Sequence, residues 1–422
     1  MMLVIIVLEL KHMKPHSSKF YIFSIIGPGI VVMLADSDAG SLITASQSGA
    51  AWGYKLLLLQ FLLIPILYIT QELAVRLGIF TGKGHGELIK DHFGKKWAWF
   101  SVTTLLVTCF GAIVTEFVGV VGVGNLFGVS PTISVSLAAA FLIIIVWTSS
   151  YLTVERFAII LGLFELVFFY VAFKAHPSMS TISSTVLDIP IHNKDYLFLV
   201  AGNIGAVIMP FMIFYQQSAI VDKKLRAHDL SFARIDTLIG AILTQLIMAT
   251  VLVAVAATIG KVNPNVSLNT VEQISHAITP FLGEDIGKII FAIGILGASM
   301  VAAVVVSLTA SWGVGEVMGF KRSLQDHLKE APIFYALFTL FLIIGAIVVA
   351  SGKINLVKLS ISVEVMNAIL LPIVLIFLFL LAKNALPEKY RLKGTYAYIT
   401  GTILFLTSAF GVYAGISGAI SG

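Results

Sequence analysis

Charged residues are scarce in this chain of 422 residues, and cysteine is almost missing. Aspartate, glutamate, lysine and arginine together make up 12% of the sequence, whereas hydrophobic residues make up 58%. Soluble domains of this length do not have such a composition, so we expect a polytopic membrane protein that lies in the lipid bilayer. A single cysteine, Cys109, excludes an intrachain disulfide, and we expect it to serve packing.

Signatures of catalysis and nucleotide binding are missing as well. The sequence has no Gly-rich nucleotide loop, no zincin-type His-Glu spacing and no serine triad. An intramembrane enzyme would need a matched acid–base or nucleophile set, which we do not find. In a membrane protein, a net charge of +5 reflects the basic loops that set its orientation, so it does not by itself indicate nucleic-acid binding. We therefore expect neither an enzyme nor a nucleic-acid-binding protein, and no cofactor.

Long apolar runs dominate what is present. Each of them is expected to cross the bilayer, for which a helix needs about 20 residues. The eleven segments are roughly 21–50, 54–80, 97–124, 131–150, 155–174, 196–220, 234–260, 285–314, 332–351, 354–382 and 394–420. The hydrophilic stretches between them, of which 175–195 and 261–284 are the longest, are expected to be ordinary loops.

Lysine and arginine are distributed unequally between the loops. If the N-terminus is cytoplasmic, the basic residues of the inner loops outnumber those of the outer loops. This bias predicts a plasma-membrane protein with a cytoplasmic N-terminus and, because the number of segments is odd, an extracytoplasmic C-terminus. Residues 1–20 are expected to be a cytoplasmic tail, with 1–12 an extended start or a disordered end.

The first apolar segment is interrupted by acidic residues near its centre. The run Asp-Ser-Asp-Ala-Gly-Ser occupies positions 36–41 between membrane-type residues. A charged group at the centre of a bilayer costs ~2.5–3.5 kcal/mol on insertion scales, and glycine is about 1 kcal/mol less favourable than alanine inside a helix. A helix broken at such a point, with acids at the break, is typical of a transporter's cation site.

The sixth apolar segment carries a second interruption, Gly202–Pro210. Proline removes a helical hydrogen bond and clashes with the preceding turn. Paired breaks five helices apart predict an all-α, LeuT-type inverted-repeat (5+5) transporter fold with 11 transmembrane helices. One transmembrane domain, 21–422, would contain repeat one at about 21–174, repeat two at about 196–382 and an extra helix at about 394–420.

The two breaks together contain a set of candidate metal ligands. Asp38 would supply a formal charge, Ala35 and Ala206 freed carbonyls, and Ser41 a hydroxyl or a held water. Such oxygen ligands suit Mg²⁺ and Mn²⁺. Met209 would add a thioether, which favours softer transition metals, although packing in the core is the alternative role for Met209.

Other intramembrane polar residues could complete this site or its pathway. Asp36 would add negative potential or bind an ion through water, and Gln216 would line the inner vestibule. Glu116 is either a structural hydrogen-bonding group or a pathway residue. Glu364 and Asn367 are three residues apart and share one face of the tenth segment.

Four further polar residues are expected to have other roles. Glu72 and Arg76 are four apart and should form an intrahelical ion pair. Asp236 is expected at the cytoplasmic face near Arg234, and a role in gating is an alternative for it. His85 is assigned to a solvated basic loop.

The residues around both breaks resemble those of the NRAMP family of divalent metal transporters. The similarity runs through Gly27–Gly29, Asp38, Gly40, Gln47–Ala50, Gly53–Leu57, Ala74–Lys83, Gly205–Pro210 and Arg234–Gly240. This resemblance implies import of a divalent metal ion by alternating access, with the ion as substrate. It also implies that a side chain of the tenth helix completes the site, and Asn367 is our candidate for that position.

The sequence departs from the family pattern at several of these positions. Ser41 stands where the family has asparagine, Phe211 where a histidine follows Met-Pro, and Ile113 where an aspartate precedes the glutamate at Glu116. Since the family's histidine and aspartate handle protons, we expect transport without obligatory proton coupling. The Asp-x-Asp pattern at 36–38 resembles the NRAMP-related magnesium branch, whereas Met209 resembles the manganese and iron branch.

The expected function is therefore import of Mg²⁺ and/or Mn²⁺, with Fe²⁺ as a further candidate substrate. One alternative is a proton-coupled Mn²⁺/Fe²⁺ transporter. A second is an amino-acid transporter of the same fold, which Asp36 and Asp38 disfavour because they would repel a substrate carboxylate. A third alternative is an ion channel, which the paired helix breaks disfavour because they are typical of carriers. The oligomeric state is left open.

Overall fold

A computed structural model describes residues 27–148, 150–262, 268–279, 282–351 and 355–419, and it contains no β-strand in these ranges. Ten helical stretches of the described chain are long and apolar enough to cross a membrane. They are α5 (Leu57–Thr81), α7 (Lys95–Leu126), α8 (Pro131–Thr148), α9–η1–α10 (Tyr151–Gly162, Leu163–Leu166 and Val167–Lys174), α12–α13 (Lys194–Val207 and Pro210–Asp222), α14 (Leu230–Val262), α16 (Glu284–Met318), α17 (Pro332–Ala350), α18 (Leu356–Asn384) and α19 (Gly394–Ala419).

The described part of the first predicted segment, 21–50, forms two shorter helices separated by the expected break. They are α3 (Pro28–Leu34) and α4 (Ala39–Trp52). The predicted cytoplasmic tail, 1–20, lies outside the described residues, as do positions 21–26. The count of eleven transmembrane helices therefore stays a prediction, as do the two repeat boundaries.

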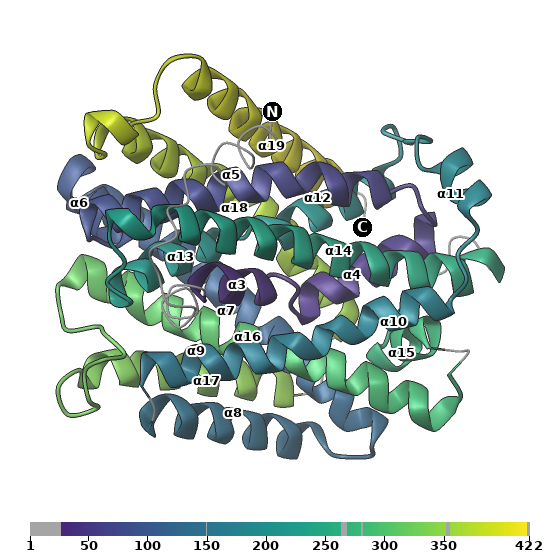
Figure 1. Cartoon of the computed structure of the whole chain (residues 1–422). Coiled ribbons are helices and arrows are strands. Elements are labelled where there is room, and N and C mark those ends of the chain that lie inside the picture. The colour runs from purple at the N-terminus through teal and green to yellow at the C-terminus, as the bar shows by residue number, and fades with distance from the viewer. Residues whose placement is uncertain (1–26, 149, 263–267, 280–281, 352–354, 420–422) are drawn as a thin grey trace.

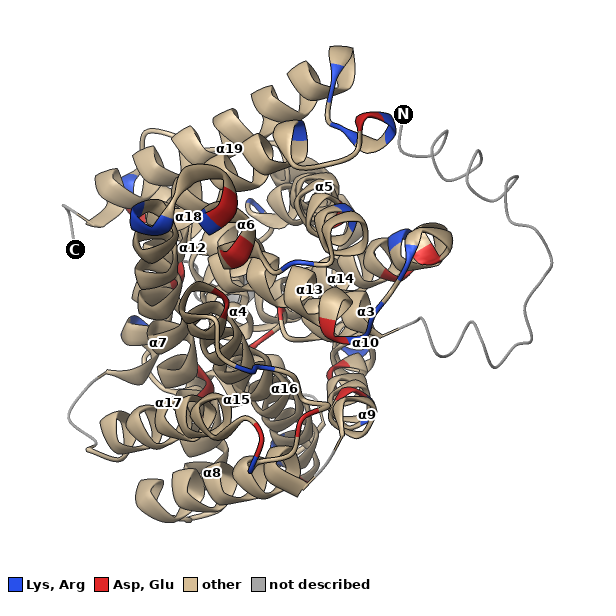
Figure 2. Cartoon of the chain, turned by 90° about the vertical axis from the view of Figure 1, so that its left-hand side faces the viewer, with Lys and Arg blue, Asp and Glu red and all other residues tan. Residues whose placement is uncertain are grey.

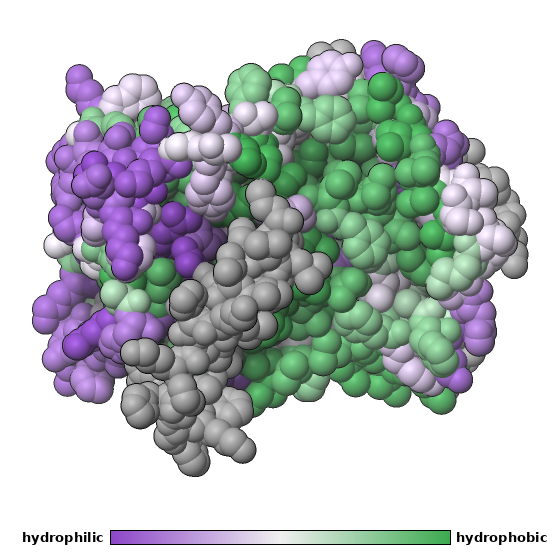
Figure 3. Space-filling model, turned by 45° about the horizontal axis from the view of Figure 1, so that its top comes forward, coloured by the Kyte–Doolittle hydropathy of each residue, from purple (hydrophilic) through white to green (hydrophobic). Residues whose placement is uncertain are grey.

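The broken helices lie at the centre of the bundle (Figure 1). α14 packs along α3, α4 and α5, α12 packs against α18 and α19, and α16 packs against α7. Hydrophobic side chains cover the middle of the molecule, with hydrophilic residues gathered at its two ends (Figure 3). Figure 2 shows lysine, arginine and acidic residues at the helix ends and loops of one such end. This distribution matches a protein whose long helices cross a bilayer.

The break in the first segment follows from local capping. α3 ends at Leu34, and a turn leads to Asp38, which has an extended backbone (φ −65°, ψ 176°). Asp38 caps α4, because its Oδ1 accepts a hydrogen bond of 2.7 Å from the Ser41 amide. The carboxylate thus satisfies one of the unpaired amides that every helix N-terminus leaves.

The break in the sixth segment follows from proline. α12 ends at Val207, Met209 is extended (φ −81°, ψ 137°), and Pro210 begins α13. Because Pro210 has no backbone N–H, the carbonyl of Ala206, four residues earlier, has no helical donor. Both predicted breaks are confirmed.

Three short helices lie where the sequence predicted loops. α11 (Met179–Thr185) and α15 (Val271–Ile278) lie within the hydrophilic stretches, and α6 (His85–Phe93) lies within the loop expected to be basic and solvated. α15 buries Val271, Ile274 and Ile278, which share one helix face. The predictions of ordinary loops at 175–195 and 261–284 were wrong in this respect.

The assignment of His85 to a solvated loop was also wrong. Its side chain is fully buried, and its Nδ1 lies 2.9 Å from Gln217 Oε1 on α13. The ring also packs edge-on against Phe214, with ring centroids 4.7 Å apart. Its partners Phe214 and Gln217 lie 129 and 132 residues further along the chain, so the local sequence around His85 does not indicate them.

Candidate functional site

The two breaks meet through one side chain. Ser41 Oγ, in the first turn of α4, donates a hydrogen bond of 3.0 Å to the Ala206 carbonyl. This is the carbonyl that Pro210 leaves without a helical donor. The other carboxylate oxygen of Asp38, Oδ2, is buried and has no hydrogen-bond partner within the described chain. The breaks therefore bring Asp38, Ser41 and Ala206 together.

The other two predicted ligands are buried at the breaks. Ala35 follows the last residue of α3, and Met209 precedes the first residue of α13; both have 0% exposure. No three His, Cys, Asp or Glu side chains of the described residues converge into a metal cluster. A metal bound here would therefore need carbonyl, hydroxyl or thioether donors beside its carboxylates, which is the mixture predicted from sequence.

Asp36, in the turn between α3 and α4, contacts α14. Its Oδ2 accepts a hydrogen bond of 3.3 Å from Thr244 Oγ1 on α14, and its Oδ1 is buried without a partner in the described part of the chain. Ser37, the next residue, donates to the carboxylate of Glu165 in η1. The turn between α3 and α4 is thus held by α14 on one side and by the fifth segment on the other.

Glu116 of α7 lies at the N-terminus of α4. Its Oε2 accepts a hydrogen bond of 3.3 Å from the Ala39 amide, and its Oε1 accepts one of 3.3 Å from Thr115 Oγ1. A carboxylate at this position is stabilised by the helix dipole. The contact supports the structural role considered for Glu116, and it places the side chain beside Asp38.

Gln216 lies on α13 and is fully buried. Its Nε2 donates to Thr237 Oγ1 on α14 at 3.4 Å, and its Oε1 has no partner among the residues described. Gln216 thus contacts α14 from the helix that follows the second break, and its place in the inner vestibule stays a prediction.

Two side chains of α18 reach the same region. Asn367 Nδ2 donates a hydrogen bond of 3.0 Å to Glu364 Oε2, while Glu364 Oε1 and Asn367 Oδ1 are buried without partners among the described residues. Sequence reasoning selected Asn367 and did not select Glu364 as a ligand. Glu364 could have been selected from the sequence, because it is an acidic residue in the middle of an apolar helix and such residues usually have a function.

The end of α3 away from the break is fixed by Asp236. The Asp236 carboxylate accepts hydrogen bonds from the amides of Gly29 (2.7 Å) and Gly27 (3.3 Å). Lys223 and Glu155 form an ion pair of 2.6 Å. This pair lies beside Gly27, since a Cβ atom added to Gly27 would come 1.4 Å from Glu155 Oε1. Asp236 therefore holds the N-terminus of α3 against α14.

The predicted ion pair between Glu72 and Arg76 is confirmed, and Arg234 of α14 joins it at 2.7 Å from Glu72. All three side chains belong to the same end of the molecule as Asp236. The basic side chains buried at this end are therefore paired with nearby acids.

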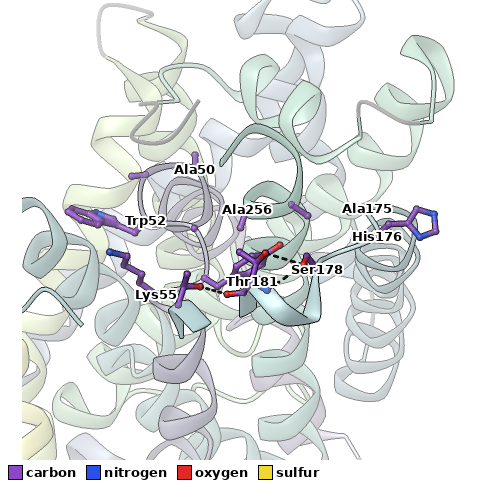
Figure 4. Close-up of a pocket in the computed structure, with 13 residues that line it drawn as sticks. Ala50, Trp52, Lys55, Ala175, His176, Ser178, Thr181 and Ala256 are labelled. Carbon is purple, nitrogen blue, oxygen red and sulfur yellow. Dashed lines mark hydrogen bonds between the residues drawn. The ribbon is translucent and has the colours of Figure 1, made fainter. Parts of the chain in front are cut away.

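Two cavities lie at the opposite end, beyond α4. One, of about 670 Å³, is lined by residues that include Gln47, Trp52, Leu268 and Ile361. The second, of about 580 Å³, is lined by residues that include Trp52, Lys55, His176 and Thr181 (Figure 4). Gln47 Oε1 accepts a hydrogen bond of 2.8 Å from the Leu268 amide, so the segment before α15 contacts α4 here.

Comparisons with known proteins give relatives over most of the chain. Proteins named divalent metal cation transporter MntH are similar from Staphylococcus aureus (24% identical over 432 residues, 96% of this chain and 93% of the relative) and Yersinia enterocolitica (27% over 322 residues, 73% and 76%). The relative from Listeria monocytogenes is 25% identical over 304 residues, which span 67% of this chain and 66%, just under two thirds, of the relative. These names are those of transporters and not of enzymes.

Solved structures resemble the whole bundle. A manganese transporter of Eremococcus coleocola superposes with a TM-score of 0.73 at 18% identity, covering 96% of this chain and 90% of that one. The transporter MhsT in complex with L-phenylalanine gives 0.61 at 13% identity, covering 92% and 98%. At such identities the likeness concerns the fold alone, and it confirms the predicted inverted-repeat transporter fold.

The family assignment rests on a match that covers nearly all of the membrane-spanning chain. Residues 29–417 match the family described as natural resistance-associated macrophage protein-like, Nramp. The match includes both breaks, nine of the ten long helical stretches in full and the tenth up to residue 417. The chain is a multi-pass membrane protein and belongs to the Nramp family.

Proposed function

We propose that this protein imports divalent metal cations, Mg²⁺ and/or Mn²⁺, across the plasma membrane by alternating access and without obligatory proton coupling. In this proposal the N-terminus is cytoplasmic and the C-terminus extracytoplasmic. The observation that carries the proposal is the junction of the breaks, where Ser41 contacts the Ala206 carbonyl next to Asp38, whose Oδ2 has no hydrogen-bond partner among the described residues. Relatives named as divalent metal cation transporters support it.

The charge of the buried carboxylate supports a cation as the substrate. Burying an ionised carboxylate without a partner is strongly unfavourable. Among the described residues, the buried lysine and arginine side chains are those of Arg76 and Lys223, and they already pair with Glu72 and Glu155 at the inner end. A cation from solution is therefore the counter-ion that Asp38 lacks.

The donor types support hard divalent metals with some tolerance for softer ones. The Asp38 carboxylate, the Ser41 hydroxyl and the carbonyls of Ala35 and Ala206 are the oxygen ligands that Mg²⁺ and Mn²⁺ prefer. The Met209 thioether would add affinity for Mn²⁺ or for softer ions such as Cd²⁺.

Two apolar side chains support transport without protons. Phe211 and Ile113 are both fully buried, and neither can carry a proton at the positions where the family has histidine and aspartate. The membrane potential can drive uptake instead, since a divalent ion moving inward gains ~4.6 kcal/mol per 100 mV.

A proton-coupled Mn²⁺/Fe²⁺ transporter is the second candidate function. Its supporting observation is Glu116, a buried carboxylate bonded to the first turn of α4 beside Asp38. Such a group could pass a proton when the metal binds. An amino-acid substrate has less support, because Asp36 and Asp38 would repel its carboxylate.

A metal panel in proteoliposomes tests the proposal. The purified chain should take up Mn²⁺ under an inside-negative potential, Mg²⁺ should compete, and an internal pH dye should report no metal-driven acidification. Acidification that accompanies Mn²⁺ would support the second candidate instead. Absence of uptake for every divalent metal would contradict both.

A further inference from the structure

Glu364 is a buried carboxylate that belongs to neither of the two broken helices. It lies in the middle of α18 and is fully buried. Asn367 Nδ2 donates to its Oε2 at 3.0 Å, but its Oε1 has no hydrogen-bond partner in the described part of the chain. One amide donor does not compensate an ionised carboxylate inside a membrane protein.

The free oxygen of Glu364 enters the first break at Gly40. A Cβ atom on Gly40 would lie 2.3 Å from Glu364 Oε1, 3.3 Å from Thr115 Oγ1 and 3.4 Å from Asp38 Oδ1. Three oxygens, from α18, α7 and the capping residue of α4, therefore surround one point. The missing side chain of Gly40 is what lets Glu364 approach Asp38.

The backbone of the same residue touches the second break. A Cβ atom on Gly205 of α12 would lie 1.8 Å from the carbonyl oxygen of Glu364. α12 and α18 thus approach closely at this residue, one position before Ala206. Glu364 is accordingly the point at which α18 contacts both breaks, with its side chain at Gly40 and its backbone at Gly205.

We propose that Glu364 is a second carboxylate ligand of the bound divalent cation, facing Asp38 across Gly40. This inference rests on the proposed function. Asp38 Oδ2 and Glu364 Oε1 are both buried and unpartnered in the described chain, and two carboxylates balance the charge of one divalent ion. Asn367 positions Glu364 through its amide and offers its own free oxygen, Oδ1, to the same shell. Carboxylate and amide oxygens suit Mg²⁺ and Mn²⁺.

A purely structural role makes a different prediction. If Glu364 served only to bind Asn367, glutamine would keep that hydrogen bond and the shape of the side chain. If Glu364 is a ligand, removing its charge should weaken the binding of Mg²⁺ and Mn²⁺ while the metal-free protein stays equally stable.

The test is Mn²⁺ and Mg²⁺ binding to the full-length protein in detergent, measured by titration calorimetry. Glu364→Gln should raise both dissociation constants about 10- to 100-fold, with an unchanged melting temperature in the absence of metal. Glu364→Asp, which keeps the charge but shortens the reach, should fall between wild type and Glu364→Gln. Wild-type affinity in Glu364→Gln would overturn the proposal.

A pair of glycine variants tests the geometry even if Glu364→Gln does not fold. Gly40→Ala places a methyl group against the flexible end of Glu364, so it should displace Oε1 and weaken Mn²⁺ binding. Gly202→Ala on α12 is the matched control, because its new methyl would meet the side-chain carbons of Thr44, Ile361 and Val365. Equal Mn²⁺ affinity in the two variants would overturn the proposal.

Metal binding by the wild-type protein distinguishes failure of the Glu364 inference from failure of the proposed function. If wild type binds Mn²⁺ and Mg²⁺ and the Glu364 variants bind them equally well, the inference fails and the proposed function stands. If wild type binds no divalent metal, the proposed function fails and the inference fails with it.

Discussion

Ser41 Oγ lies 3.0 Å from the carbonyl oxygen of Ala206, and this hydrogen bond joins the breaks of two helices that are 165 residues apart in sequence. The carbonyl is available because Pro210 cannot donate to it. Ser41 lies in the turn that Asp38 caps, with its amide donating to Asp38 and its hydroxyl donating to Ala206. The junction therefore depends on Asp38 and Pro210, which define the two breaks, and on Ser41, which connects them.

Removing the Ser41 hydroxyl should weaken this junction. In Ser41→Ala the Ala206 carbonyl loses its donor, so we expect the free energy of unfolding to fall by about 1 kcal/mol and Mn²⁺ uptake to fall several-fold. Ser41→Thr keeps the hydroxyl and is the control. Unfolding in detergent and initial uptake rates in proteoliposomes measure the two effects, and wild-type values for both in Ser41→Ala would refute the proposed role.

Met209 should discriminate between metals. It is fully buried, at the extended residue before Pro210. Met209→Ala removes the only soft donor proposed for the site, so Mg²⁺ uptake should persist while Mn²⁺ and Cd²⁺ uptake weakens. Competition between Mg²⁺ and Mn²⁺ measured on the variant and the wild type checks this. An equal loss for all three ions would mean that Met209 serves packing alone.

Acid should destabilise the protein through His85. Burial lowers the pKa of this histidine to about 4 against an ordinary value of 6.5, although its hydrogen bond with Gln217 opposes the shift. Because the unfolded chain binds the proton more tightly, His85 favours the folded state above pH 6.5. That advantage is lost as the pH falls from 6.5 towards 4, by roughly 3 kcal/mol over the whole window.

The measurement is the melting temperature of the detergent-solubilised protein across this pH window. His85→Gln should flatten the decline, since it leaves no group to protonate. His92→Gln is the matched control, because His92 lies on the same helix α6 but is exposed, with its Nδ1 bonded to the Leu88 carbonyl. Identical slopes in wild type and His85→Gln would show that other groups govern the acid response.

The sequence predicted the breaks but not all of their neighbours. Asp38 and Pro210 act on their own turns, so local patterns were enough to find them. Glu364 reaches Gly40 across more than 300 residues of sequence, and its approach depends on a missing side chain on another helix. That contact belongs to the packing of α18 against α4, which no local pattern encodes.

The short helices were missed for a related reason. α6, α11 and α15 contain nine, seven and eight residues, fewer than a span requires, and they lie in polar stretches. The apolar faces of α6 and α15 are stabilised by the long helices against which they pack, α7 for α6 and both α14 and α16 for α15, and not by intrinsic helix propensity. α11 buries none of its residues, so packing does not explain it.

The measurement that tests the central claim most directly is the uptake of Mn²⁺ by Asp38→Ala compared with wild type in the same proteoliposome preparation. Asp188→Ala is the control, since that aspartate forms an exposed ion pair with Lys55. We predict that wild type and Asp188→Ala take up Mn²⁺, with competition by Mg²⁺, and that Asp38→Ala is folded and inactive. Retained Mn²⁺ uptake by Asp38→Ala would contradict a metal site at the junction of the two breaks.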